Sequence, residues 1–447
     1  MNENSKRLAL LETEDVKKAL LRLGIPTMAG MLVSALYNLV DALFIGRLGT
    51  LETAAVSILY PLTMVGTGIG LLFGSGAGSY ISRLLGQKDY RAVAACSSTA
   101  ILTGVAVIAL LAGAMLLFFD PLMGALGATD SILPYARAYG ILYIIGIVFN
   151  VFNMILNNLL VAEGAASMST AAMLAGGFTN LVLDPVLIFG AGMGVAGAAA
   201  ATLISQMLSS VIYLFCLRRG GSLLTLSPRF FKPSRALYAQ IVKIGLPVCF
   251  FQFLSGGAVG LTNVAARPFG EAAIAAMGIV NRLMSLEVSA LYGFLKGYSP
   301  LVGYSFGAGQ RDRVNAATRT AVLWSTAVNI LFGLGCLVFS GPLIHLFNQE
   351  SAEVLAIGRT ALSVDGVAFM TLGLQIVVGN YFLATGKAKQ GGILSVCRQG
   401  IFFIPFLFIF TGLWGLTGLI FAQLAADLCA TAVTLFLWKR EPALKPA

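Results

Sequence analysis

The chain has 447 residues, of which 58% are hydrophobic and only 11% are charged, and its mean hydropathy is +0.88. This composition excludes a water-soluble globular fold and indicates a protein that spans a lipid bilayer. The net charge of +10 comes from short basic clusters between apolar runs, which orient spans in a membrane and do not indicate a nucleic-acid partner.

Twelve apolar stretches are long enough to cross a bilayer, and charges, Pro or Gly bound each of them. The backbone finds no hydrogen-bond partners in lipid, so spans must be helices or a closed barrel, and long unbroken runs favour helices. We therefore expect an all-α membrane protein. Its first six spans cover about 24–46, 54–81, 93–119, 135–161, 168–190 and 194–217. The second six cover about 245–266, 274–303, 317–341, 358–384, 391–411 and 415–438.

Lysine and arginine gather on one side of these predicted spans. With a cytoplasmic N-terminus, 22 of the 29 fall in cytoplasmic segments and four fall outside, while Arg282, Lys296 and Arg398 lie within spans. One missed span would place every later loop on the wrong side and destroy this asymmetry. The ratio of 22 cytoplasmic to four external basic residues therefore supports both the span count and the orientation. We expect a multi-pass protein of the cytoplasmic (inner) membrane with both termini in the cytoplasm.

Short motifs recur about 221 residues apart. Leu23–Pro26 resembles Ile244–Pro247, and Gly86–Asp89 resembles Gly309–Asp312. Six spans per repeat is an even number, so the two halves enter the membrane from the same side as parallel repeats. The predicted organisation is an N-terminal six-helix lobe over 1–217, a cytoplasmic linker over 218–243 and a C-terminal six-helix lobe over 244–447. A cleft between two such lobes permits alternating access by rocking.

Acidic side chains within spans need a reason, because an ionised group at the bilayer centre costs roughly 3 kcal/mol. In the first half, Asp41 shares a helix face with Tyr37, and Asn180 lies four residues before Asp184. Both spans start from the cytoplasmic side, and both aspartates lie ~22 to 27 Å along them. Thr202 on the sixth span reaches a comparable level.

A stripe of asparagines that includes Asn157 adds further oxygens on the fourth span, although Asn157 falls lower by the same count. Carboxylate, amide and hydroxyl oxygens at one depth suit Na⁺, and two close carboxylates can equally share a proton. The alternative is that these groups only hold helices together by hydrogen bonds. At the repeat offset Asp41 maps near Thr262 and Asp184 near Ile404, so the predicted ion site belongs to the first half alone.

The second half carries a different polar set within its spans. It comprises Glu287, Lys296, Asp365, Gln375, Arg398 and Asp427. Glu287 and Lys296 are nine residues apart, about half a turn around the helix, and cannot pair with each other. Arg398 or Lys296 can pair with Asp427 or Asp365 on another helix. A structural network and contact with substrate remain equally open for this set.

The sequence gives little support for a disulfide framework, a metal site, ATP hydrolysis or an enzymatic activity. The six cysteines show no CxxC spacing, and His345 is the single histidine, so neither a disulfide framework nor a metal site is expected, beyond Na⁺ at the acid pair. No GxxxxGK[ST] motif is present, and no signature of an intramembrane enzyme is found. We expect a protein that is not an enzyme, has no cofactor and uses an H⁺ or Na⁺ gradient.

Several motifs together resemble the multidrug and toxic compound extrusion (MATE) transporters over essentially the whole chain. These are Gly24–Pro26, Tyr37–Asp41, Gly46–Gly49, Asn180–Pro185, Gly194–Ala199, Ala275–Ile279 and Pro300–Ala308. The resemblance implies a V-shaped pair of six-helix bundles that exports drugs or metabolites in exchange for H⁺ or Na⁺. It also implies that Pro26 lets the first span bend.

The same resemblance implies a cation site formed by Asp41, Asn180, Asp184 and Thr202, with Tyr37 and Asn157 beside it. One departure is Lys296, where the family more often shows a neutral polar residue, and this lysine disfavours cationic substrates near its span.

The favoured function is a monomeric antiporter, with the bilayer and a small amphipathic, often cationic substrate as its partners. The runner-up is a flippase for a lipid-linked oligosaccharide or another amphipathic lipid. Such a flippase would line its cleft with many basic residues, and here only Arg282, Lys296 and Arg398 qualify. A channel or receptor is disfavoured because buried acids suit ion-coupled cycling better than conduction.

Overall fold

The computed structural model describes residues 3–219, 222–347 and 351–441, and these residues form helices joined by short loops. The first half contains α1 (Glu3–Glu12), α2 (Val16–Gly46), α3 (Thr50–Ile58), α4 (Tyr60–Gly86), α5 (Tyr90–Leu117), α6 (Phe119–Ala125), α7 (Leu133–Ala162), α8 (Ala166–Pro185), η1 (Val186–Gly190) and α9 (Gly194–Arg219).

The second half begins with the short η2 (Pro228–Phe230) of the linker. It continues with α10 (Arg235–Ala266), η3 (Arg267–Phe269), α11 (Glu271–Gly307), α12 (Arg311–Phe347), α13 (Ala352–Phe369), α14 (Leu372–Ala384), α15 (Ala388–Val396), η4 (Cys397–Phe403) and α16 (Ile404–Arg440).

The number of spans in the described ranges agrees with the prediction. Ten helical runs are long and apolar enough to cross a membrane, and α13 with α14, bent by 46° at their junction, adds an eleventh. The last run, Ala388–Arg440, has 53 residues and would be about 80 Å long, against a bilayer core of about 30 Å. Its backbone breaks at Gly415, where φ is +60°, so this run supplies two spans. The predicted all-α fold of twelve spans is confirmed.

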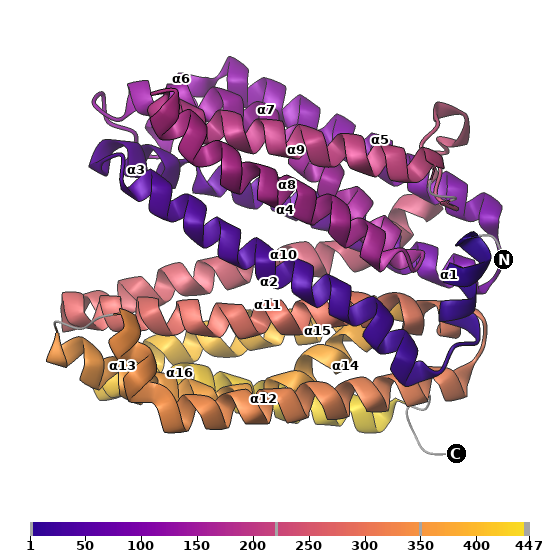
Figure 1. Ribbon diagram of the computed structural model, residues 1–447. Helices are drawn as coiled ribbons and strands as arrows, with labels where there is room; N and C mark the ends of the chain where they lie inside the picture. Colours follow the sequence, from indigo (N-terminus) through magenta and orange to yellow (C-terminus); the bar gives the residue numbers. More distant parts are fainter. Residues whose placement is uncertain (1–2, 220–221, 348–350, 442–447) are drawn as a thin grey trace.

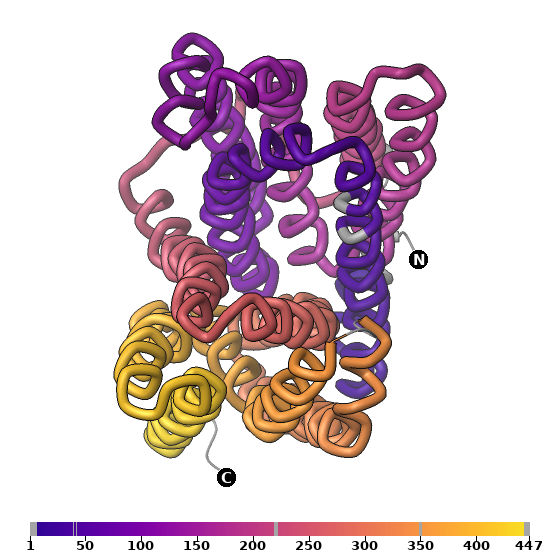
Figure 2. Tube along the Cα trace, turned by 90° about the vertical axis from the view of Figure 1, so that its left-hand side faces the viewer, coloured from indigo at the N-terminus to yellow at the C-terminus, as the bar shows by residue number. Residues whose placement is uncertain are grey.

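The helices form two bundles that lie one above the other in Figure 1. Figure 2, turned by 90°, shows the indigo-to-magenta bundle above the salmon-to-yellow one. The bundles pack through α2 against α11 and through α4 against α10. In Figure 1 they converge at the end that holds both termini and diverge at the end of α3, α6 and α13.

The backbone itself repeats between the two bundles. Residues with positive φ include Gly49 and Gly270, Lys88 and Gly309, Gly164 and Gly386, and Gly194 and Gly415. The members of each pair are 221 or 222 residues apart. The same left-handed positions therefore end or begin corresponding helices in both halves, so the repeat seen in the sequence is a repeat of backbone conformation.

Glycines bring the two bundles into close contact where they converge. A Cβ atom at Gly245 of α10 would overlap the carbonyl group of Leu72 on α4, and one at Gly307 of α11 would overlap the carbonyl group of Arg83. A Cβ atom at Gly257, also on α10, would meet no other atom within 4 Å. Small residues are how helices approach closely in membranes, where apolar burial supplies little attraction.

The helix α1 contacts both bundles. Arg313 of α12 donates hydrogen bonds to the carbonyl oxygens of Leu10, Leu11 and Glu14, at 3.3, 3.0 and 2.6 Å, and so caps the end of α1. From the other side, Arg7 lies 3.5 Å from Glu163, in the loop between α7 and α8. The helix therefore ties the first bundle to the second at the converged end.

Glu163 is the buried acid of this junction, with 2% of its surface exposed. It accepts hydrogen bonds from the Ser222 hydroxyl at 2.9 Å and from the Leu223 amide at 2.9 Å. Burial raises the pKa of Glu163 from 4.5 to about 7, against the opposing effects of Ser222, the Leu223 amide and Arg7. Burial thus outweighs the stabilisation that these groups and the Leu224 amide give the charged form.

We predict that Gly245→Ala weakens the packing of the bundles, because the added methyl group meets backbone atoms that cannot move aside. Overpacking of this kind costs about 1 to 3 kcal/mol. The thermal unfolding midpoint of the purified protein in detergent should fall. Gly257→Ala, on the same helix but in open space, is the control, and an equal loss in both variants would contradict the close contact.

A second prediction concerns pH. The folded protein holds the Glu163 proton up to about pH 7, whereas the unfolded chain releases it near 4.5, so this group's contribution to stability falls as pH rises through that window. The shift corresponds to roughly 3 kcal/mol. The side chain of Glu163→Gln is neutral at every pH. The thermal unfolding midpoint of this variant, relative to that of the parent, should therefore rise between pH 5 and pH 8. Parallel pH profiles for the two proteins would refute this assignment.

Candidate functional site

Two aspartates from neighbouring helices of the first bundle form the centre of the predicted ion site. Asp41 lies on α2 and Asp184 near the end of α8, and these helices pack against each other. Asp184 has 1% of its surface exposed, whereas Asp41 is half-buried. The carboxyl groups interact electrostatically, and Asn180 donates a hydrogen bond of 3.1 Å to Asp184 Oδ1. The structure therefore brings together three of the predicted residues.

Each of these aspartates keeps one buried oxygen without a hydrogen bond. Asp41 Oδ1 and Asp184 Oδ2 have no donor within the described part of the chain. A buried carboxylate oxygen left unpaired is costly, and two neighbouring carboxylates repel each other. A shared proton or a bound cation would relieve both penalties. The arrangement is suited to bind and release one positive charge.

The helix of Asp184 changes its geometry directly after the acid. Pro185 ends the regular turns of α8, and residues Val186–Gly190 continue as a π-helical segment. Proline removes a backbone donor, and π-helical turns are frequent at functional sites because they loosen the backbone hydrogen-bond ladder. The carboxyl group of Asp184 thus sits at a point where the helix can deform.

Three tyrosines lie within electrostatic range of the acid pair. Tyr37 on α2 was predicted there and interacts with Asp41. Tyr139 and Tyr143 on α7 were not predicted, yet Tyr139 interacts electrostatically with both acids and Tyr143 with Asp41. Their rings stack with centroids 5.2 Å apart. Their spacing of four residues was the available signal, but nothing in one helix's sequence shows which neighbouring helix its phenols will face.

The structure places Thr202 and Asn157 in other hydrogen bonds. Thr202 donates to the carbonyl oxygen of Ala198 in its own helix at 3.0 Å. Asn157 donates to Ser169 Oγ at 2.8 Å and to Tyr213 OH at 3.1 Å. Its side-chain oxygen accepts a hydrogen bond from Lys296 on α11 of the other bundle. Asn157 therefore links the bundles, and its role at a cation site stays a prediction.

A cavity of about 630 Å³ lies between the bundles and extends into the second one. It is lined by residues of α2, α4 and α7 from the first bundle and of α10, α11, α13, α14, α15, η4 and α16 from the second. Among its lining residues, the charged ones are Lys296, Asp365 and Arg398, and Asp41 and Asp184 are absent from the lining. The cavity and the acid pair are therefore separate features.

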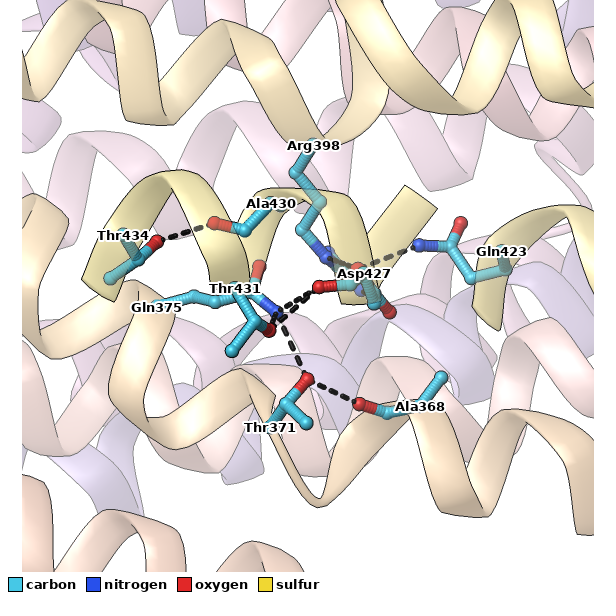
Figure 3. A network of polar contacts seen from close by, with 9 residues as sticks. All are labelled: Ala368, Thr371, Gln375, Arg398, Gln423, Asp427, Ala430, Thr431 and Thr434. Carbon is cyan, nitrogen blue, oxygen red and sulfur yellow. Dashed lines mark hydrogen bonds and ion pairs between the residues drawn. The ribbon is translucent and has the colours of Figure 1, made fainter. Parts of the chain in front are cut away.

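Figure 3 shows the polar network of the second bundle around Asp427 on α16. Arg398 of η4 forms an ion pair with Asp427, with 2.6 Å between Nε and Oδ1, and Gln423 donates to the same oxygen at 3.1 Å. Gln375 donates to the Asp427 carbonyl oxygen at 3.1 Å. Asp427 is fully buried, and its charge is balanced by Arg398.

The two other acids of the second bundle differ from Asp427. Asp365 on α13 is 8% exposed, lines the cavity and interacts with Arg398 only at long range. Glu287 on α11 is buried outside the cavity lining, and its Oε2 has no hydrogen-bond partner in the described ranges. Of the predicted polar set, Asp427 and Arg398 thus form an ion pair with each other, whereas Asp365 lines the cavity.

A fold of two six-helix bundles around a central cavity, with a pair of interacting aspartates inside one of them, is that of a polytopic membrane transporter. The chain belongs to the MatE family, whose model matches residues 26–186 and 247–409, one segment in each bundle.

Similar proteins share this architecture. The "Multidrug export protein MepA" of Staphylococcus aureus (strain MRSA252) is 30% identical over 441 residues, which cover 97% of this chain and 96% of that protein. A solved outward-facing multidrug resistance MATE transporter matches with a TM-score of 0.91 at 27% identity and covers 97% of both chains. A MATE protein solved in a bent conformation gives a TM-score of 0.90 at 27% identity, with the same coverage.

We predict that Asp427→Asn destabilises the second bundle, because it leaves the Arg398 charge buried without its partner. Breaking a buried ion pair in this way costs about 3 to 5 kcal/mol. The variant should show a lower unfolding midpoint in detergent and a lower amount in the membrane. Gln423→Leu, which removes one hydrogen bond to the same carboxylate, should lose clearly less. A variant Asp427→Asn as stable as the parent would mean that the pair is kept for something other than stability.

Proposed function

We propose that this protein is an antiporter that exports small amphipathic molecules from the cytoplasm in exchange for H⁺ or Na⁺. The observation that carries the proposal is the pair of aspartates, Asp41 and Asp184, each with one buried oxygen that no donor satisfies in the described ranges. The MatE family membership and the multidrug export named for the similar MepA protein support export as the direction.

In this proposal the acid pair is the coupling site and the central cavity is the substrate site. Asn180 holds one carboxylate through its hydrogen bond, and Tyr37 and Thr202 complete the ligand set when the helices shift. Charging or discharging the pair alters the packing of α2 against α8. Pro26 lies inside α2, fifteen residues before Asp41, and interrupts its backbone ladder, which makes it the hinge that converts this change into bending.

Orientation follows from the distribution of basic residues in the sequence. The converged end carries both termini, which we place in the cytoplasm, so the diverging end faces outward. Alternating access then requires the contacts at Gly245, Gly307 and α1 to open. The cavity lacks the many basic residues expected of a flippase. Arg398 is already neutralised by Asp427, and Lys296 is the remaining basic residue in its lining.

The test is export from vesicles that hold the protein, with ethidium as substrate and with ΔpH and ΔNa⁺ imposed separately. Asp41→Asn and Asp184→Asn should each lower gradient-driven export by about tenfold or more, because each variant loses one ionisable group of the pair. The gradient that drives the parent protein identifies the coupling ion.

The control is Asp120→Asn, which removes an exposed acid of the same bundle that pairs with Arg137 at the surface. It should export like the parent. Rates are compared at equal protein abundance in the vesicle membrane. Export by both aspartate variants at the parental rate would refute the assignment of the coupling site.

A further inference from the structure

Lys296 is a basic side chain in the central cavity without an acidic partner. It lies on α11, is partly buried and contributes to the cavity lining. Within the described ranges no Asp or Glu oxygen lies within ion-pair distance of its ammonium group. Its Nζ instead donates to the amide oxygen of Asn157 on α7, a neutral acceptor in the other bundle.

The charges around the cavity are unevenly compensated. Arg398 is held by Asp427 in an ion pair, so it presents little free positive charge. Asp365 has no ion pair in the described part of the chain and lines the same cavity from α13. The remaining polar lining consists of neutral amides and hydroxyls, among them Gln252 and Asn281. The cavity thus offers one basic and one acidic side chain on separate helices, and neither forms an ion pair within the described ranges.

Helix packing alone does not account for a lysine at this place. A neutral glutamine could hold Asn157 across the same boundary without the cost of placing a charge in a low-dielectric region. A lysine that keeps three donors and has a neutral acceptor gains most when an anion arrives, because charge-assisted hydrogen bonds are roughly twice as strong as neutral ones.

We propose that Lys296 binds a carboxylate group of the exported substrate, so that the cavity selects amphipathic zwitterions whose cationic end lies toward Asp365. This inference rests on the proposed export function and names the substrate class for the same cavity. On binding, the carboxylate replaces Asn157 as the acceptor of Lys296. Because that hydrogen bond joins the two bundles, substrate binding removes one contact that holds them together.

The test uses two dyes that differ at one group. Rhodamine 110 is a zwitterion with a free carboxylate, and rhodamine 123 is its cationic methyl ester. Full-length protein in proteoliposomes is given each dye under both ΔpH and ΔNa⁺, and the ratio of the export rates, rhodamine 110 over rhodamine 123, is measured. A ratio does not depend on how much protein is inserted.

The expected result is that the parent exports rhodamine 110 and that Lys296→Gln lowers the ratio by about tenfold, which is the effect of losing one charge-assisted bond. Lys296→Arg keeps the positive charge and should hold the ratio within about threefold. Lys243→Gln removes an exposed lysine of α10 and is the matched control, with the parental ratio expected.

Two outcomes would overturn the proposal while export itself stands. One is a parent protein that exports rhodamine 123 but not rhodamine 110. The other is a Lys296→Gln variant that slows both dyes equally, which would make Lys296 a contact between bundles and nothing more. Failure of the parent to export either dye under either gradient would overturn the export function and this inference together.

Discussion

The proposed mechanism depends on the repulsion between two neighbouring carboxyl groups, of which Asp184 is buried and Asp41 is half-buried. Asp41 and Asp184 come from different helices, interact with each other, and each retain a buried oxygen without a donor. In such a setting the charge state of the pair decides how closely α2 and α8 can pack. Under the proposed mechanism, binding of a proton or a sodium ion stabilises the packing of these two helices, and its release weakens that packing.

The acid pair and the cavity are separate, so a physical connection between them is needed. The helix α7 provides one: Tyr139 interacts electrostatically with the acids, and Asn157, five turns further along the same helix, accepts the hydrogen bond of Lys296. A rigid helix that contacts both places can transmit a displacement without a chain of intervening polar groups. We therefore propose that packing and one hydrogen bond between the bundles carry the coupling.

The sequence predicts the fold well because the bilayer restricts it severely. Length, hydropathy and the distribution of basic residues determine the span count, and the positive-φ pairs such as Gly194 and Gly415 show that the sequence repeat is structural. Contacts between helices are harder to predict, because the sequence of one helix does not name its neighbour. Asp41 and Asp184 were paired by depth, but Tyr139 and the link from Asn157 to Lys296 required the three-dimensional packing. For Arg398, the sequence left Asp365 and Asp427 open as partners, and the structure selects Asp427.

The two bundles show how one backbone supports two kinds of chemistry. Both halves repeat the same helix ends, but the first keeps an acid pair with unsatisfied oxygens, and the second keeps Asp427 neutralised by Arg398. A neutralised pair has no reason to take up an ion, whereas an unsatisfied pair does. In the proposed mechanism this asymmetry of charge gives the bundles different tasks: the first responds to the ion gradient, and the second lines most of the cavity. In the proposed cycle, this difference in charge gives the rocking of two similar bundles its direction.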